Sequence, residues 1–233
     1  MSIVLAVQFG NYCLTAFRSA RVPSVITALP SLSHQAQRLI ELDVHRIAGL
    51  PADQLRKLPD RAGALLVVHP DLAPASALAP LLRMNDKPGF VVMDMADVDE
   101  FAPISAVKLP DAPLYLIRDV DRGDAMANWS PDEALGAIAD AGRTPLTLTE
   151  GLHWLLQRPD TLARGRCFMT IGSRHRKPDG SLDARTPAVW ISNGTGRDGP
   201  ANRNAPKVGW CWAGNRHTWL GFASAARRFP IDG

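Results

Sequence analysis

The sequence has few cysteines and no apolar run long enough to cross a membrane. Its three cysteines, Cys13, Cys167 and Cys211, are too few and too scattered for a disulfide framework, and an odd number fits a reducing compartment. The apolar N-terminal stretch is interrupted by Gln8 and Asn11 and lacks the basic start of a signal peptide. We therefore expect a cytoplasmic protein without a membrane segment, and 233 residues are enough to bury a core without disulfides.

Recognisable nucleotide, nucleophile and metal motifs are also missing. Residues 194–199 read GTGRDG, but a dinucleotide fingerprint also needs a helix that opens at this loop and an acidic residue about twenty positions on. Here Pro200 and Pro206 bracket the following residues, and no such acidic residue is present. There is no G-x-S-x-G motif. The spacings among Cys167, His175, Cys211 and His217 are not those of a closed zinc module. We expect no cofactor and no bound metal.

Charge is divided unevenly along the chain. The formal net charge is only +3, but residues 1–150 hold 13 Lys and Arg against 18 Asp and Glu, whereas residues 151–233 hold 13 against 5. The second segment therefore carries a net charge of +8. Such a segment can attract phosphate or nucleic acid, or it can pair with the acidic part of its own chain or stay solvated. Its arginines are spread over predicted loops, which favours the self-paired or solvated alternative.

The first two thirds of the chain mix helical and strand patterns. Apolar periodicity predicts a helix over residues 33–48, and β-branched apolar runs predict strands at 64–69, 89–94 and 114–120. Ser130, Pro131 and Glu133 form a capping box that starts a helix, and Gly142 ends it. A further helix follows, with Thr149 as its expected N-cap.

The last third is rich in short strands. Apolar runs at residues 167–173, 188–192, 208–212 and 218–222 are separated by loops of glycine, proline, asparagine and arginine. This order predicts an α+β fold with a helix-rich N-terminal half and an antiparallel or mixed sheet with hairpins in the C-terminal part.

Residues 210–220, WCWAGNRHTWL, carry the strongest local signal, that of a tryptophan-rich hairpin. A two-residue loop at 214–215 would pair Trp210 with Trp219 and place Trp212 and His217 on the same face. We favour this register because a glycine suits the turn. A three-residue loop stays open as the alternative, and it would instead place Cys211 beside His217.

Three functional hypotheses follow. We favour a protein that binds a small planar or anionic ligand, or a partner, through its C-terminal aromatic and basic region. The rivals are a thiol- or histidine-dependent enzyme that uses Cys167 or Cys211 with His175 or His217, and a nucleic-acid-associated protein. The balance is against an enzyme, and no catalytic residue is assigned. The candidate ligand-binding residues are Trp210, Trp212, Arg216, His217 and Trp219.

Several phrases together resemble an actinobacterial family known only as a domain of unknown function. They include KPGFVVMDMADVDEFAPI, GRTPLTLTEGL and, most recognisably, GWCWAGNRHTWLGFASA, and the resemblance covers about residues 32–228. It implies one α+β domain over residues 31–233, with residues 1–30 as an N-terminal extension. The loops HRKPDGSLDART and TGRDGPANRN look longer than is usual for the family, which makes their arginines poor candidates for a shared function. The resemblance implies no activity or cofactor.

Overall fold

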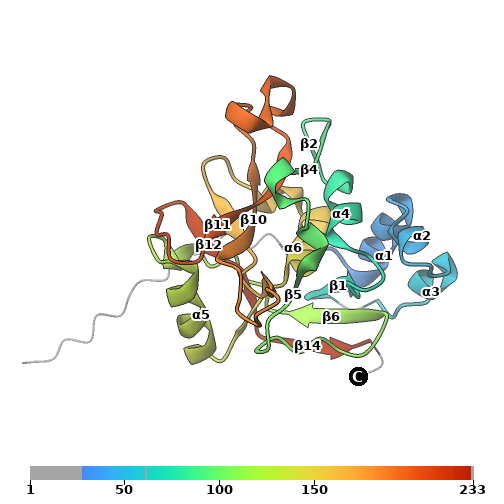
Figure 1. Ribbon diagram of the computed structural model, residues 1–233. Helices are drawn as coiled ribbons and strands as arrows, with labels where there is room; N and C mark the ends of the chain where they lie inside the picture. The colour runs from blue at the N-terminus through green and yellow to red at the C-terminus, as the bar shows by residue number, and fades with distance from the viewer. Residues whose placement is uncertain (1–27, 61, 232–233) are drawn as a thin grey trace, which may run out of the picture.

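The computed structural model describes residues 28–60 and 62–231, so most of the predicted N-terminal extension lies outside the described residues. Figure 1 shows the first three helices gathered on one side of the molecule and α5 on the other, with α6 between them. No helix in the described part is long and apolar enough to span a bilayer. The α-helices are α1 (Leu32–Glu41), α2 (Val44–Ile47), α3 (Ala52–Arg56), α4 (Ala75–Leu78), α5 (Pro131–Asp140) and α6 (Leu148–Gln157). Single turns of 3-10 helix are η1 (Ala79–Leu81), η2 (Met93–Met95), η3 (Val98–Glu100), η4 (Asp124–Met126), η5 (Pro159–Thr161), η6 (Gly196–Asp198) and η7 (Pro200–Asn202).

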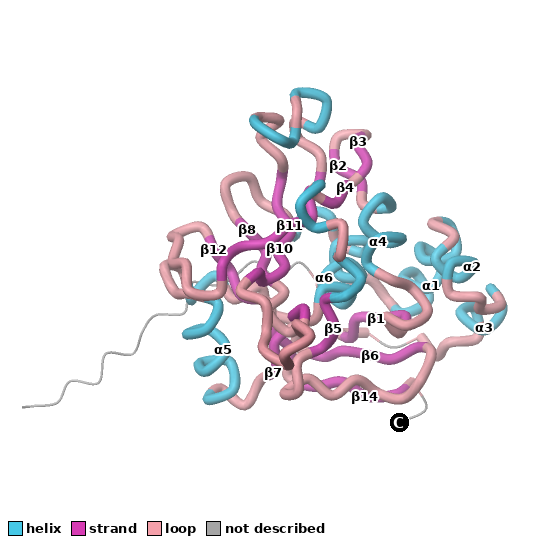
Figure 2. The backbone as a smooth tube through the Cα atoms, viewed as in Figure 1, coloured by secondary structure: helices cyan, strands magenta, loops and turns pink. Residues whose placement is uncertain are grey.

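The strands form two main sheets and three short two-stranded pairs (Figure 2). The larger sheet is mixed, because β12 runs parallel to β8 and β4 runs parallel to β11, whereas β10 is antiparallel to both of its neighbours. The predicted α+β class is confirmed. In sheet order, the antiparallel three-stranded sheet is β1 (Ala64–Val68), β6 (Leu114–Arg118) and β14 (Arg227–Pro230); the five-stranded sheet is β12 (Leu220–Phe222), β8 (Cys167–Met169), β10 (Arg185–Ile191), β11 (Pro206–Trp212) and β4 (Phe90–Val91); and the pairs are β13 (Ser224–Ala225) with β7 (Thr144–Pro145), β2 (Arg83–Met84) with β3 (Lys87–Pro88), and β5 (Phe101–Pro103) with β9 (Ser173–His175).

The predicted helix over residues 33–48 is interrupted. Asp43 adopts a left-handed conformation with φ of 57°, which ends α1 and starts α2 after a tight turn. Aspartate is one of the few residues that tolerate this conformation, so the break has a local cause. The predicted strand at 89–94 is also shorter than expected, because the chain turns into η2 at Met93.

Two capping boxes set the starts of α5 and α6. At α5 the prediction is confirmed: the Ser130 hydroxyl accepts from the Glu133 N–H, and the Glu133 carboxylate accepts from the Ser130 N–H. At α6 the predicted cap Thr149 is wrong. Thr147 is the cap, and Glu150 closes its box by accepting from the Thr147 N–H at 2.8 Å. The spacing Thr-x-x-Glu at 147–150 is the signal for this position.

Helix α6 is the centre of the core, and all ten of its residues are buried. It packs against β1, α1 and α4, and the ring of its Trp154 meets that of Phe168 on β8, with centres 5.3 Å apart. Its contact with β8 is close at Gly151, where a Cβ atom would lie 2.5 Å from the Thr170 methyl group and 2.8 Å from the Phe168 ring. The helix therefore joins the three-stranded and five-stranded sheets into one core.

A buried ion pair ties α6 to β14. The Arg228 guanidinium meets the Glu150 carboxylate through two nitrogens, at 2.5 and 2.7 Å, and also donates to the Pro145 carbonyl at 2.8 Å. The Tyr115 hydroxyl donates to Glu150 at 3.0 Å. Burial, followed by the Glu150 charge, raises the pKa of Tyr115 well above its ordinary value. The carboxylate thus has partners on every side, as a buried charge requires.

A second buried polar group on α6 is His153, which must be neutral. Its Nδ1 contacts the Thr149 carbonyl at 2.8 Å and therefore donates, whereas its Nε2 accepts from the Val68 N–H at 3.2 Å. Complete burial lowers the pKa of His153 from 6.5 to about 4. The imidazole thereby provides a hydrogen-bond acceptor for the Val68 N–H at the end of β1.

The predicted tryptophan-rich hairpin does not form, so both of its registers are wrong. β11 pairs with β10 and β4, whereas β12 pairs with β8, and two strands separate them in the sheet. Trp210 lies opposite Pro187, not opposite Trp219. Residues 213–216 suit a hairpin turn, but all seven residues of β11 pair with β10, and none pairs with β12.

Candidate functional site

A groove of about 290 Å³ lies where the short strand β4 leaves the edge of the five-stranded sheet. We call it the tryptophan groove, because Trp190 from β10 and Trp210 from β11 both line it. The turn into η2 and the loop carrying η6 and η7 complete its walls. Its lining residues are Phe90, Val91, Val92, Met93, Asp94, Trp190, Asp198, Asn202, Lys207 and Trp210.

The position of Trp190 in the groove depends on its cross-strand neighbours on β11. Trp190 pairs with Lys207, and the Lys207 Nζ lies 4.7 Å from the centre of the indole ring, a cation–π distance. The same ammonium group is 2.5 Å from the Asp198 carboxylate, whose other oxygen accepts from the Ser192 hydroxyl. The lysine charge is therefore already compensated within the protein, and the lining of the groove combines aromatic with polar side chains.

Gly209 is needed for the Trp190 ring to lie against β11. A Cβ atom at Gly209 would come within 2.6 Å of the Trp190 Cη2 atom and 3.3 Å of the Val92 side chain. We expect Gly209→Ala to lower the free energy of unfolding by about 1–3 kcal/mol, because the rigid ring must move. Urea denaturation measures this loss.

Gly214→Ala is the matched control for that substitution. A Cβ atom at Gly214 would meet nothing within 4 Å, so this variant should unfold close to the wild-type midpoint. Equal midpoints for the two variants would contradict the role given to Gly209. The Trp190 emission spectrum should also shift only in Gly209→Ala, since the groove changes shape only there.

One of the five candidate residues lines the groove, and a second lies next to it. Trp210 lines it and is half-buried, and Trp212, two residues farther along β11, is 47% exposed. Their rings meet edge to face, with centres 4.5 Å apart and planes at 65°. Trp212 does not itself line the cavity, but it extends the aromatic surface beyond the end of the groove.

The other three candidates lie outside the groove, on the segment that leads into β12. The His217 and Trp219 rings stack at 4.5 Å with an interplanar angle of 11°, and Trp219 is 46% exposed. The Arg216 guanidinium pairs with Glu133 at the start of α5. The hairpin that was expected to bring Trp210, Trp212, His217 and Trp219 onto one face does not form.

The cysteines of the enzyme hypothesis are half-buried thiols. Cys167 and Cys211 belong to the apolar cluster between α5 and the five-stranded sheet. Burial, with a smaller effect of Cys211, raises the pKa of Cys167 to about 12, and burial also raises the pKa of Cys211. Near neutral pH both are protonated and weakly nucleophilic. Within the described residues, no hydrogen bond joins either sulfur to a histidine.

One of the two histidines proposed as their partner, His175, belongs to a different cluster. Its Nε2 lies 3.0 Å from a Glu100 oxygen and its Nδ1 lies 3.5 Å from Asp97. Arg185, at the start of β10, pairs with Asp97 at 2.5 Å and with Asp183 at 2.9 Å. Arg185 also lowers the pKa values of both aspartates. The cluster fastens η2 and η3, and so one wall of the groove, to β9 and β10.

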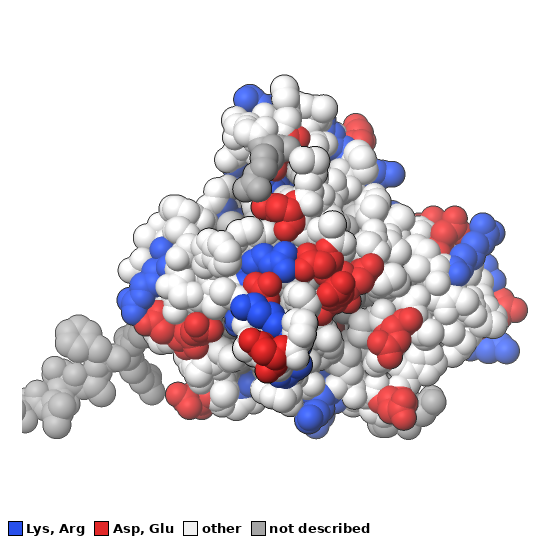
Figure 3. Space-filling view, in the orientation of Figure 1, with Lys and Arg blue, Asp and Glu red and all other residues white. Residues whose placement is uncertain are grey.

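Part of the basic C-terminal third is paired with the acidic part of the chain. Figure 3 shows basic and acidic side chains side by side over the middle of the face in view, with no area of one sign alone there. Four arginines of residues 151–233 pair with acidic residues of 1–150, as the self-paired alternative expects. These pairs are Arg174–Asp132, Arg185–Asp97, Arg216–Glu133 and Arg228–Glu150.

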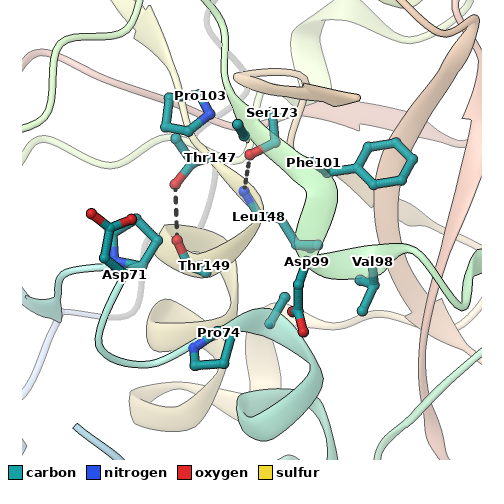
Figure 4. Close-up of a pocket in the computed structure, with 13 residues that line it drawn as sticks. Asp71, Pro74, Val98, Asp99, Phe101, Pro103, Thr147, Leu148, Thr149 and Ser173 are labelled. Carbon is teal, nitrogen blue, oxygen red and sulfur yellow. Dashed lines mark hydrogen bonds between the residues drawn. The ribbon is translucent and has the colours of Figure 1, made fainter. Parts of the chain in front are cut away.

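A second, smaller cavity of about 110 Å³ lies at the N-terminus of α6 (Figure 4). The hydroxyls that line it are already used by the protein. Those of Thr147 and Thr149 lie 3.3 Å apart, and that of Ser173 accepts from the Leu148 N–H at 3.0 Å. In the described part of the chain, His, Cys, Asp and Glu form no group of three or more that could hold a metal ion. The tryptophan groove is therefore the better candidate site.

Most residues of the groove were not among the sequence candidates. Trp190 was assigned only to a strand, and the loop TGRDGPANRN was considered for its arginines, although it contributes Asp198 and Asn202. A usable signal was the pattern of Trp190 on one strand and Lys207 on the next, since an aromatic ring and a lysine make a good cross-strand pair. Nothing in the sequence identified the short strand at Phe90 as the neighbour of β11.

Comparison with known proteins places the chain in a family. Neither the curated proteins nor the solved structures gave a match. The model of one family, described as a family of unknown function, matches residues 38–231, which is most of the chain and most of its described part. The resemblance seen in the sequence phrases is thereby confirmed. The chain belongs to the family of unknown function DUF5701.

Proposed function

We propose that the protein binds a small, planar, uncharged ligand in the tryptophan groove. The observation that carries this proposal is that two tryptophans and several polar side chains line one groove of about 290 Å³, close to the size of small-molecule sites. A planar ligand can stack on an indole ring. The Lys207 ammonium has three N–H donors and uses one on Asp198, so it can also donate to a ligand.

The charge of the groove favours an uncharged ligand over an anionic one. The ammonium group of Lys207, the one lysine among the described lining residues, is neutralised by Asp198. An anion would have to compete with Asp198 for Lys207. The thiol-dependent alternative is disfavoured by the raised pKa of Cys167, and the nucleic-acid alternative by the paired arginines. A cytoplasmic location remains our expectation from the cysteine content.

Titration with planar fragments, such as neutral purines and indoles, tests the proposal through tryptophan fluorescence and calorimetry. We expect Trp210→Ala to weaken fragment binding by about tenfold or more, because stacking on an aromatic ring is worth about 1–3 kcal/mol. Trp219→Ala is the control, since Trp219 is an exposed tryptophan that lies outside the groove. If no fragment binds, or if both variants lose affinity equally, the proposal fails.

A further inference from the structure

The edge of β11 is only partly covered by its neighbour β4. Strand β11 has seven residues, but β4 has two, and these pair only with Lys207 and Val208. The last bond on this side runs from the Val92 N–H to the Val208 carbonyl at 2.9 Å. Beyond it the chain turns into η2 and leaves the edge. Among the strands that the structure describes, none therefore lies beside Trp210–Trp212 on the β4 side.

The register shows which backbone groups point to this open side. In an antiparallel pair, residues alternate between bonding to the partner strand and pointing away from it. The Val208 carbonyl points to β4, whereas the Ala213 N–H bonds to the Ala184 carbonyl on the β10 side at 2.7 Å. Trp210 and Trp212 lie two and four residues after Val208, so their backbone N–H and C=O groups point, like those of Val208, away from β10 and toward the open side. Among the described residues, the Trp210 N–H and C=O and the Trp212 N–H have no backbone partner.

This stretch of edge lacks the usual protection against added strands. Natural edges are blocked by proline, by lysine, by a bulge or by a covering loop. Here the sequence is Trp-Cys-Trp, and the strand pairs with β10 without a bulge. Its flank is apolar as well, since Trp212 is 47% exposed and Met93, beside the groove, is 81% exposed. Open backbone groups beside exposed apolar side chains are complementary to an extended peptide.

We propose that an extended peptide from a partner protein adds to β11 at Trp210–Trp212 as a further strand, end to end with β4. Its backbone bonds to the outward groups of Trp210 and Trp212, and one of its planar side chains enters the tryptophan groove. Alternate side chains of the peptide face the groove, because side chains alternate along a strand. This inference rests on the proposed function and identifies the planar ligand as a side chain presented by a peptide.

Selection from a displayed library of random linear peptides, followed by calorimetry on the intact protein, tests the proposal. The selected peptides should carry aromatic residues at alternating positions. N-methylation of every second peptide N–H should weaken binding by about tenfold or more, whereas methylation of the intervening N–H groups should have little effect. This signature needs no protein variant. Failure to select a binder, or equal sensitivity at all positions, overturns the proposal.

A pair of variants distinguishes the contribution of the β11 backbone to peptide binding from that of its side chains. Trp212→Ala keeps the outward N–H and should retain most of the affinity, whereas Trp212→Pro removes the N–H and should abolish binding. Equal affinity of the two variants argues against strand addition. Protection of the Trp210 and Trp212 amides from hydrogen exchange on binding provides the direct readout in the unmodified protein.

Two further outcomes are distinguishable. If free planar fragments bind in the groove but peptides do not, the peptide inference fails and the proposed function survives. If the wild-type protein self-associates with rising concentration and Trp212→Pro does not, the edge is occupied by a second copy of the chain, and the proposal of a partner peptide is overturned.

Discussion

Replacing Arg228 by methionine is expected to lower the free energy of unfolding by about 3–5 kcal/mol. The substitution keeps much of the apolar volume but leaves the Glu150 carboxylate, which is fully buried, without its cation. The Tyr115 hydroxyl and the Thr147 N–H remain as donors, but neither carries a charge. Urea denaturation at neutral pH measures the loss, with the slope of the transition as a check on two-state behaviour.

Arg227→Met is the matched control, because Arg227 is the preceding residue of β14 and is exposed. Surface substitutions of this kind change stability by about 0.5 kcal/mol or less. The double variant Arg228→Met, Glu150→Gln should recover part of the loss, since it removes the uncompensated charge. If Arg228→Met proved no more costly than Arg227→Met, the ion pair would not have the structural role described.

The second large effect is a loss of stability between pH 6.5 and pH 4, caused by His153. Its pKa is about 4 in the folded protein and 6.5 in the unfolded chain, so the unfolded chain binds the additional proton in this interval. The free energy of unfolding contributed by neutral His153 is fully present above pH 6.5, declines as the pH falls and is lost below about pH 4. The shift corresponds to about 3 kcal/mol. Denaturation midpoints measured between pH 6.5 and pH 4 give the dependence of stability on pH.

His153→Gln isolates this contribution from other titrating groups. A glutamine amide can donate to the Thr149 carbonyl and accept from the Val68 N–H, but it does not bind a proton in this range. The variant should therefore lose less stability between pH 6.5 and pH 4 than the wild type. Below that range both proteins should weaken as Asp97 and Asp183 are protonated, because their pKa values lie below 3.8 in the folded state. Parallel pH curves down to pH 4 would exclude His153 as the source.

Local chemistry predicted the elements that depend on few neighbours. The capping box at Ser130 and Glu133 needs only the backbone of one helical turn, so the sequence was sufficient to locate it. Continuous apolar runs likewise predicted β1 and β6, where nearly every residue is buried. The α+β class follows from these elements in order.

Local sequence patterns do not determine which distant segments pair as strands, so the strand order could not be predicted. The turn at 213–216 had suitable residues for a hairpin, but seven residues of β11 pair with β10, and β12 finds β8 instead. The burial gained by this arrangement depends on packing across the whole sheet. The tryptophan groove was missed for the same reason, because Phe90 and Trp210 are brought together only by the parallel pairing of β4 with β11.

The position of Arg228 at the end of the described chain has a consequence for folding during synthesis. Strand β14 is the last strand described, yet it covers an outer edge of the sheet whose other strands, β1 and β6, are made much earlier. A nascent chain that has emerged as far as α6 exposes Glu150 without its cation. Such an intermediate must keep the carboxyl group protonated or hydrated, so α6 cannot settle into a dry core at that stage. Emergence of β14, not that of β1 and β6, is therefore the step that permits the core to close around Glu150.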